Sequence, residues 1–354
     1  MAIIFNFLMM LKKNRIYPVL LVMAVFIVWL IRQNVQKPHS EKLIKVSFNG
    51  ETMGTYYNII YLHPDGVNFK PSIDSLLLVW NRSLSTYIPD SEISRFNQGT
   101  SFRFESPYFY PVLVKSREVF QATDGAFDPT VMPLVNAWGF GPADKEIPDS
   151  ARVAELKELV DFNKIIFDSI EVEKTKPGMS LDFSAIAKGY GVDIVGKFIE
   201  HKGIENYLVD IGGEITCRGI NDRGSAWTTG IEDPDVELLE RKIKAVIEVT
   251  DKSIATSGNY RNFYVKDGKK YAHTIDPHTG YPVEHSMLST TVIANDCMTA
   301  DAYATAFMVL GIDEAIRLIN EHPEMDAYFI FSDNEGKIQT FMTDGFRSIL
   351  KSEN

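Results

Sequence analysis

Cysteine is scarce in this 354-residue chain, and its scarcity argues against two kinds of protein. Cys217 and Cys297 are the only cysteines, so there is no disulfide framework, and one bridge is the most that they could form. Neither lies in a Cys-x-x-Cys or Cys/His cluster, which argues against a zinc site. We expect two buried cysteines that act as small apolar side chains.

Excess basic charge is also lacking. Lys and Arg number 36 against 47 Asp and Glu, which gives a net charge of -11. Proteins that bind nucleic acids usually carry a basic surface, so we expect no nucleic-acid partner. A phosphate ligand remains compatible with this charge, because a divalent cation or a helix N-terminus can hold phosphate. No Gly-x-Gly-x-x-Gly segment leads from a strand into a helix, so a Rossmann-type site is not supported.

One long apolar run is present, at residues 16–31, and three basic residues precede it. As a helix it would span about 24 Å, less than the roughly 30 Å hydrocarbon core of a bilayer. The charge bias places residues 1–15 in the cytoplasm and sends the rest of the chain across the inner membrane to the periplasmic side. We expect an uncleaved signal anchor at 16–31, a polar linker at 32–42 and a single domain at 43–354.

The hydrophobic pattern of this domain mixes helices and strands without strict alternation, which favours an α+β fold. Strands are expected at 43–48 and 55–62 around a turn at Asn49–Gly50, at 207–211, at 243–249, and in a closing hairpin of 327–332 with 337–342. Helices are expected at about 71–84, 106–122, 149–160, 184–201, 299–310 and 312–321.

The first candidate for chemistry is the segment 182–191. A strand-like stretch ends at Asp182 and the predicted helix begins there, which places a carboxylate at a helix N-terminus. Gly189 and Gly191 each lower helix propensity by about 1 kcal/mol, so something is expected to approach the backbone closely. The alternative is a capping Asp followed by glycines that admit a neighbouring helix.

The second candidate is the pair Asp301 and Thr305. A spacing of four residues places both oxygens on one face of a helix, and most of the intervening positions are alanine. A carboxylate and a hydroxyl suit Mg²⁺, which usually binds few protein groups together with substrate phosphate. The alternative is a solvent-facing Asp and a Thr bonded back to its own helix.

The third candidate is the loop 271–282, in which Asp276–Pro277 and Thr279–Gly280 mark a tight turn. His273 precedes the turn, and a histidine beside a phosphoryl group can take a proton from an attacking hydroxyl near neutral pH. His278 lies at the loop tip and is expected to be a surface turn residue.

Two weaker candidates carry apolar or aromatic side chains suited to flat rings. Residues 125–130 form a turn with an aromatic residue, and Met53 and Tyr87 suit packing against an isoalloxazine or adenine ring. Each has an ordinary alternative as a turn or core residue.

The order of these stretches carries more information than any one of them. They are 53–55 (Met-Gly-Thr), 85–87 (Ser-Thr-Tyr) leading to 94–97 (Ser-Arg-Phe-Asn), 125–129 (Gly-Ala-Phe-Asp-Pro), 182–189 (Asp-Phe-Ser-Ala-Ile-Ala-Lys-Gly), 210–214 (Asp-Ile-Gly-Gly-Glu), 256–260 (Thr-Ser-Gly-Asn-Tyr), 273–280 (His-Thr-Ile-Asp-Pro-x-Thr-Gly) and 299–306 (Thr-Ala-Asp-Ala-x-Ala-Thr-Ala). In this order they resemble the ApbE family, from about residue 46 to the C-terminus.

The resemblance implies a tandem T-fold-like arrangement of mixed sheets flanked by helices, and an FAD:protein FMN transferase. Such an enzyme esterifies FMN from FAD to a threonine of an acceptor flavoprotein, in this family a subunit of a respiratory electron-transport complex, and releases AMP. The positions that match flavin contacts are Met53, Tyr87, Ala126, Phe127, Asp128, Asp182, Lys188 and Ile275. Mg²⁺ would be held by the Ala185 carbonyl, Asp301 and Thr305, and His273 would assist the incoming hydroxyl.

Two other functions fit the same residues. One is a Mg²⁺-dependent FAD pyrophosphatase that yields FMN and AMP, and the other is a flavin-binding protein without turnover. Many family members also carry a lipid-bearing cysteine after the export segment, and this chain has none there.

Overall fold

The computed structural model of the chain describes residues 22–27, 29, 43–141, 147–234, 242–259, 263–266, 269–284, 286–333 and 335–353. The chain divides into two units, 1–43 and 44–354. In the first unit, residues 22–27 and 29 are helical with exposed side chains, and the rest of the predicted anchor and the linker 32–42 lie outside the described residues. Within the described part of the chain, no helix is both long and apolar enough to span a bilayer.

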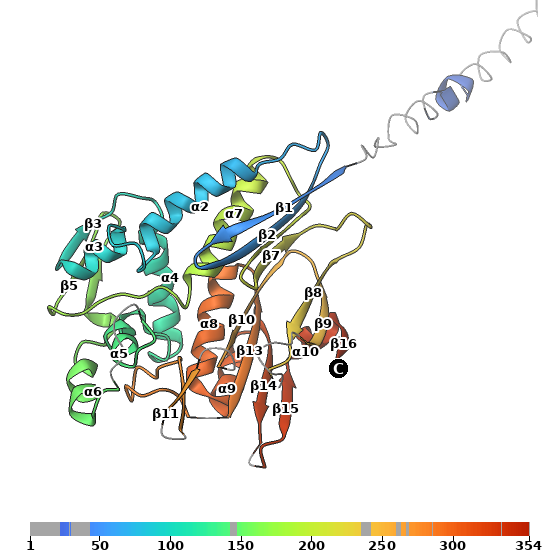
Figure 1. The fold of residues 1–354 in the computed structure, drawn as a ribbon. Coiled ribbons are helices and arrows are strands. Elements are labelled where there is room, and N and C mark those ends of the chain that lie inside the picture. The colour runs from blue at the N-terminus through green and yellow to red at the C-terminus, as the bar shows by residue number, and fades with distance from the viewer. Residues whose placement is uncertain are drawn as a thin grey trace, which may run out of the picture. The chain divides into compact units, whose positions relative to one another are not determined.

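The second unit is built on an eight-stranded sheet with the order β1-β2-β6-β7-β10-β13-β14-β15 (Figure 1). Its strands are β1 (Ile44–Thr52), β2 (Thr55–His63), β6 (Tyr207–Ile211), β7 (Glu214–Arg218), β10 (Lys252–Gly258), β13 (Met287–Ala294), β14 (Asp326–Ser332) and β15 (Ile338–Met342). All paired strands in the described residues are antiparallel. The α+β class is therefore confirmed.

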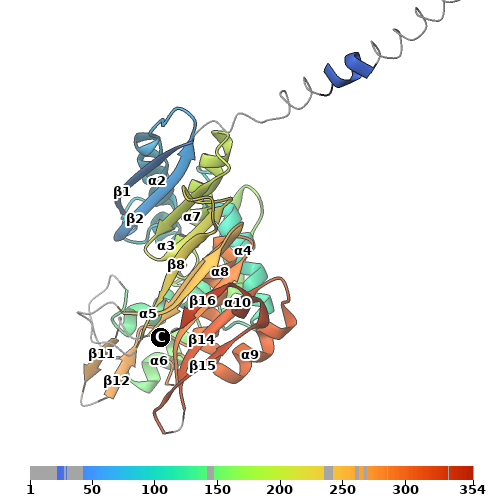
Figure 2. The ribbon, with the colours of Figure 1, turned by 90° about the vertical axis from the view of Figure 1, so that its right-hand side faces the viewer.

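Both faces of this sheet are covered, as the two perpendicular views show (Figures 1 and 2). Helices α7 (Ala187–His201) and α8 (Cys297–Leu310) pack against each other and on one face. The other face packs on a three-stranded sheet of β16 (Leu350–Glu353), β9 (Ile243–Val249) and β8 (Trp227–Glu232), with α10 (Asp344–Ile349). Burial is nearly continuous along β13 and β14, whereas β2 and β6 alternate between buried and half-buried positions.

The remaining elements are α2 (Lys70–Leu84), α3 (Glu92–Gln98), α4 (Phe109–Ala122), α5 (Met132–Ala137), α6 (Ser150–Lys157), α9 (Ile312–Glu321), the short sheet of β3 (Ser101–Arg103), β5 (Glu171–Lys174) and β4 (Ile165–Phe167), and the hairpin of β11 (Phe263–Lys266) with β12 (Lys269–Ala272). Of these elements, α2 packs on α7, and α4 and α9 pack on α8. The strands predicted at 207–211 and 243–249 and the helix predicted at 312–321 are confirmed. Both cysteines are buried thiols, as predicted.

The predicted turn at Asn49–Gly50 is wrong. Both residues lie inside β1, which runs to Thr52, and the hairpin turns at Met53–Gly54 instead. Met53 and Gly54 both have positive φ, 52° and 70°, as a tight two-residue hairpin turn requires. The Asn-Gly pair attracted the prediction because it favours the same turn, but the strand pairing continues past it.

The predicted start of the 184–201 helix is also wrong, because α7 begins only at Ala187. Asp182 instead closes a turn before the helix, where its Oδ1 accepts hydrogen bonds from the backbone and hydroxyl of Ser184, at 2.9 and 2.5 Å. The backbone of Asp182 donates to the Pro129 carbonyl at 2.8 Å. The turn before α7 is therefore held in place by its hydrogen bond to Pro129, and Asp182 does not cap α7.

Asn97 anchors the same segment from α3. Its side-chain amide donates to the Leu181 carbonyl at 2.8 Å and accepts from the Leu181 N–H at 2.7 Å. The ammonium of Lys174 adds hydrogen bonds to the carbonyls of Asn97 and Met179, at 2.9 and 2.8 Å. These contacts fix the entry of the chain into the turn at Asp182.

Replacing Asn97 with Ala should destabilise the fold by about 2–4 kcal/mol, because Leu181 would keep a buried donor and acceptor without partners. Replacing the neighbouring Gln98, which is exposed and makes one 3.5 Å hydrogen bond, should change stability by less than about 0.5 kcal/mol. Urea unfolding midpoints of the two variants measure the difference. Equal midpoints would show that the Leu181 anchor is unimportant.

Asp193 ties α7 to the beginning of α8. Its two carboxylate oxygens accept hydrogen bonds from the backbone N–H groups of Cys297 and Met298, at 2.8 and 2.9 Å. Burial raises the pKa of Asp193 to about 7, although these two donors lower it. The folded protein therefore binds a proton here more readily than the unfolded chain.

This raised pKa gives stability a definite pH dependence. Between about pH 4 and pH 7 the folded state holds the Asp193 proton that the unfolded chain has lost, so stability falls as pH rises through this window. An Asp193→Asn variant should show a shallower slope there, whereas Asp65→Asn, at an exposed site, should follow the wild-type profile. Urea unfolding at a series of pH values tests this, and an unchanged slope in Asp193→Asn would contradict it.

Candidate active site

Asp301 lies at the contact between the first turn of α7 and the second turn of α8. Its side chain is only 2% exposed, and its Oδ2 accepts a hydrogen bond from the Gly189 N–H at 2.9 Å. Gly189 is the third residue of α7, so its N–H is one of the N-terminal donors that have no partner within the helix. Asp301 supplies that partner from α8.

Gly189 explains why the two helices come so close. A Cβ at this position would lie 2.2 Å from the Cys297 carbonyl oxygen and 2.7 Å from the Asp301 Cβ. At Gly191 a Cβ would lie 2.4 Å from the Met53 Cε. The prediction of a close approach to this backbone is confirmed, and the neighbour at Gly189 is a protein helix, as the alternative held.

Lys188 and Glu214 form a buried ion pair next to Asp301. The Lys188 ammonium lies 2.5 Å from the Glu214 Oε1, and the side chains are 34% and 2% exposed. Burial lowers the pKa of Lys188, but the carboxylates of Glu214 and Asp301 outweigh burial and raise it. Burial also raises the pKa of both acids, which share one ammonium. The site therefore holds one basic and two acidic groups.

Glu214 is the residue of this cluster to which the sequence prediction gave no role. It begins β7 directly after the Gly212–Gly213 turn, and Lys188 lies 26 positions earlier on α7. A buried strand that ends in two glycines and an acid was the only available signal, and it did not reveal the partner.

Thr305 lies one helical turn beyond Asp301, half-buried, with its hydroxyl 3.1 Å from the Ser257 hydroxyl on β10. Asp301 is not solvent-facing, and Thr305 is bonded across to the sheet. The pair therefore does not match the alternative of a solvent-facing Asp and a Thr bonded back to its own helix. The carbonyl, carboxylate and hydroxyl oxygens of Ala185, Asp301 and Thr305 are of the hard type that suits Mg²⁺.

The predicted flavin positions differ widely in exposure. Tyr87 is 70% exposed after α2, whereas Met53 is half-buried in the β1–β2 turn and contacts α7. Ala126 and Phe127 are 2% and 3% exposed, at the end of the turn that follows α4. Tyr87 is therefore the most exposed of these positions, and Ala126 and Phe127 are closed to solvent.

Asp128 has a structural role in this conformation. Its Oδ1 accepts hydrogen bonds from the backbone and hydroxyl of Thr130, at 2.8 and 2.6 Å, and its Oδ2 accepts from the Phe162 N–H at 3.2 Å. Burial raises the pKa of Asp128 to about 6 against these donors. Asp128 thus caps the short 3-10 helix Pro129–Val131.

The loop that carries His273 is held on several sides. Ile275 is buried and bridges Pro282, and the Trp138 indole donates to the Gly280 carbonyl at 2.8 Å. His273 is half-buried, with its ring 6.4 Å from that of Phe140. The loop is therefore fixed in place by contacts on both sides of its tight turn.

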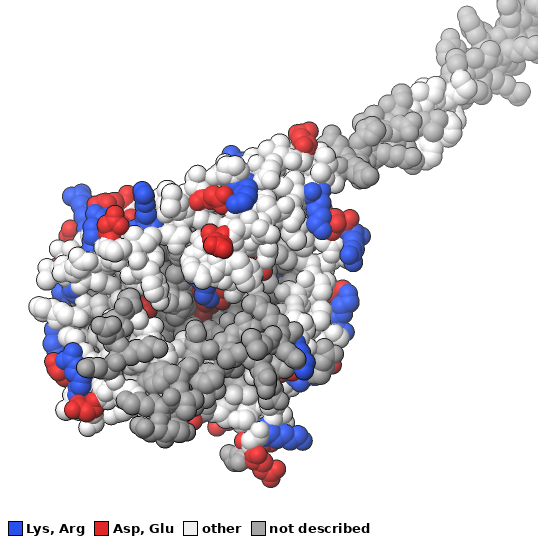
Figure 3. Space-filling view, viewed as in Figure 1, with Lys and Arg blue, Asp and Glu red and all other residues white. Residues whose placement is uncertain are grey.

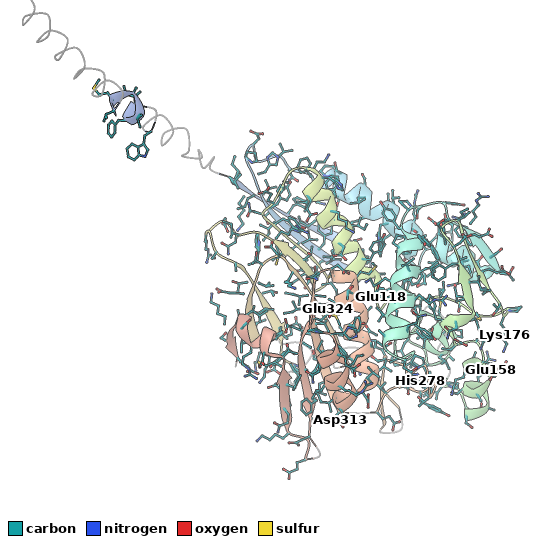
Figure 4. The ribbon with its side chains drawn as sticks, turned by 180° about the vertical axis from the view of Figure 1, so that it is seen from behind. Glu118, Glu158, Lys176, His278, Asp313 and Glu324 are labelled. Atoms are coloured by element: carbon teal, nitrogen blue, oxygen red, sulfur yellow. The ribbon has the colours of Figure 1, made fainter. Side chains whose placement is uncertain are left out.

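His278 is an exposed turn residue, as predicted, but it also contacts a residue that is distant in the sequence. Its Nε2 lies 2.7 Å from the Asp124 carbonyl, and its Nδ1 lies 3.2 Å from the Asp276 Oδ1. Figure 4 shows His278 near the end of α4, which Asp124 follows. This contact joins the His273 loop to the turn before Ala126.

The charged side chains on one face are not all peripheral. Figure 3 shows most of them around the outline, with a few of both signs set into a recess near the centre.

Comparison with known sequences gives the family. The profile of the ApbE family matches residues 53–329. The chain belongs to the ApbE family. An FAD:protein FMN transferase from Vibrio cholerae is 38% identical over 86% of this chain and 93% of its own length. The Escherichia coli protein of the same name is 34% identical over 90% of this chain and 93% of its own length.

Solved ApbE structures agree with this assignment. The flavin transferase ApbE from Vibrio cholerae matches with a TM-score of 0.79 at 36% identity, over 87% of this chain and all of that one. The apo flavinyl transferase ApbE from Pseudomonas stutzeri matches with a TM-score of 0.79 at 31% identity, over 88% of this chain and 98% of that one. The predicted ApbE family and fold class are thereby confirmed.

Proposed function

We propose that this ApbE-family enzyme is a Mg²⁺-dependent FAD:protein FMN transferase that esterifies FMN to a threonine of an acceptor protein and releases AMP. The similar Vibrio cholerae and Escherichia coli proteins are named FAD:protein FMN transferases. The observation that carries the proposal is the buried Asp301 carboxylate, which accepts a hydrogen bond from the Gly189 N–H at the N-terminus of α7 and lies one helical turn from Thr305.

Ala185, Asp301 and Thr305 would hold the cation together with substrate phosphate oxygens. Mg²⁺, when bound, supplies charge neutralisation at the pyrophosphate and polarises the bond that breaks. Asp301 contributes the anionic oxygen, and the hydrogen bond from Gly189 fixes the orientation of its carboxylate. Thr305 contributes a hydroxyl whose position is set by Ser257.

In the phosphoryl transfer, Lys188 would act on the diphosphate of FAD and His273 on the acceptor hydroxyl. The Lys188 ammonium, a third of whose side chain is exposed, can contact the anionic diphosphate of FAD. The acceptor hydroxyl attacks the phosphorus on the FMN side, in line with the departing AMP. His273 takes the proton of that hydroxyl, which is a step that imidazole commonly serves in enzymes.

The proposed place of reaction is the periplasmic side of the inner membrane. The basic residues before the apolar run 16–31 support export of the domain at 43–354. We propose that the acceptors are flavoprotein subunits of respiratory electron-transport complexes, with which the domain would share this compartment.

One incubation separates transfer from hydrolysis. The protein, FAD, Mg²⁺ and a threonine-bearing acceptor domain should give an acceptor with the added mass of FMN, together with AMP. A Thr→Ala acceptor serves as the control and should stay unmodified. Free FMN and AMP with no adduct would favour the pyrophosphatase, and no AMP at all would favour a flavin-binding protein.

A further inference from the structure

Glu214 is a buried acid with an incomplete set of partners. Its side chain is 2% exposed, and its Oε1 lies 2.5 Å from the Lys188 ammonium. Its Oε2 is also buried and has no hydrogen-bond partner among the described residues. A closed structural ion pair would satisfy both oxygens, because an unpaired buried acceptor costs about 1–3 kcal/mol.

The neighbouring charges make this arrangement costlier. Asp301 is a second buried carboxylate beside Glu214, so Glu214 also meets a like charge. The interactions of the Glu214 carboxylate with its neighbours are therefore too few to offset the cost of burying it, and a purely stabilising role does not explain the residue. A group held at such a cost is typical of a site whose partners are completed by a ligand.

Lys188 and Glu214 are arranged in a way that suits this role. Part of the Lys188 side chain is open to solvent, whereas Glu214 is enclosed. Lysine carries its charge on a flexible four-carbon stem, which must be restrained if the ammonium is to meet a ligand in one position. The short contact with Glu214 supplies that restraint from the interior.

We infer that Glu214 is a positioning residue of the flavin site, which holds the Lys188 ammonium where it meets the diphosphate of the bound dinucleotide. This inference rests on the proposed function, since it assigns FAD to the site. Glu214 itself need not contact the reacting atoms.

The test is FAD affinity, measured by flavin fluorescence with and without Mg²⁺. Glu214→Gln keeps an oxygen near Lys188 but loses the charge, and should weaken FAD binding about tenfold in both conditions. Its melting temperature is measured alongside, because removing one partner of a buried ion pair lowers stability, and FAD affinity is compared only at temperatures where both proteins are folded. Glu200→Gln, on α7, is the matched control, since Glu200 also forms an ion pair, with Arg218 at 2.6 Å, and this variant should bind FAD normally.

A double-mutant cycle separates positioning from a general effect. If Glu214 acts through Lys188, adding Glu214→Gln to Lys188→Met should weaken FAD binding no further than Lys188→Met alone. Additive losses, or unchanged affinity in Glu214→Gln, would overturn the inference. A wild-type protein that binds FAD but modifies no acceptor would contradict the transfer proposal and leave this binding test valid.

Discussion

Replacing Asp301 with Asn should lower the rate of AMP release from saturating FAD by a hundredfold or more, roughly the loss seen when one group that stabilises developing charge is removed. The Asn side chain keeps an oxygen for the Gly189 N–H but offers no anionic oxygen to a cation. The expected loss is in turnover, and some FAD binding should remain because Lys188 and the ring contacts persist. Chromatography of AMP at saturating FAD measures the rate.

Stability separates this loss from unfolding. Asp301 is buried beside a second acid, so its neutral replacement should keep the melting temperature close to that of the wild type. Asp296→Asn is the matched control, because Asp296 caps the same helix and Asn is an equally good cap. It removes the same charge five residues earlier and should retain full activity. AMP release by Asp301→Asn within about threefold of the wild type would refute the proposed cation site.

Asp301 also shows what the sequence could predict. Its four-residue spacing from Thr305 is a local property of a helix, so their common face followed directly from the pattern. The close approach at Gly189 could be predicted as well, because a glycine inside a helix lowers propensity and calls for a reason. The identity of the neighbour could not, since α8 lies more than a hundred residues further along the chain.

Glu214 and Asp128 show where such reasoning stops. The partner of Glu214 depends on how β7 is placed against α7, and no local pattern specifies that. Asp128 was assigned to the flavin by its motif, yet its oxygens are occupied by Thr130 and Phe162 in this conformation. The Asp-Pro-Thr sequence is equally typical of a capped turn, and only the hydrogen bonds reveal that role.

Gly189 allows α7 and α8 to pack closely, so a larger side chain at this position should strongly destabilise the fold. Replacing Gly189 with Ala would place a Cβ 2.2 Å from a backbone oxygen of Cys297, and a backbone atom cannot rotate away. Helix α8 would have to shift, which should cost about 3 kcal/mol or more after the helix-propensity gain of roughly 1 kcal/mol. The shift would also break the Gly189–Asp301 hydrogen bond, so activity should be lost in the fraction that still folds.

Gly191→Ala is the matched control for this prediction. It lies two residues further along α7 and gains the same propensity, but its Cβ would meet only the end of the Met53 side chain, at 2.4 Å. A methionine has three rotatable bonds and can move aside, so stability should change by less than about 1 kcal/mol. Urea midpoints of the two variants compare the helices directly. Equal destabilisation would mean that α8 can yield as readily as a side chain, and the tight α7–α8 contact would then not explain the glycine at 189.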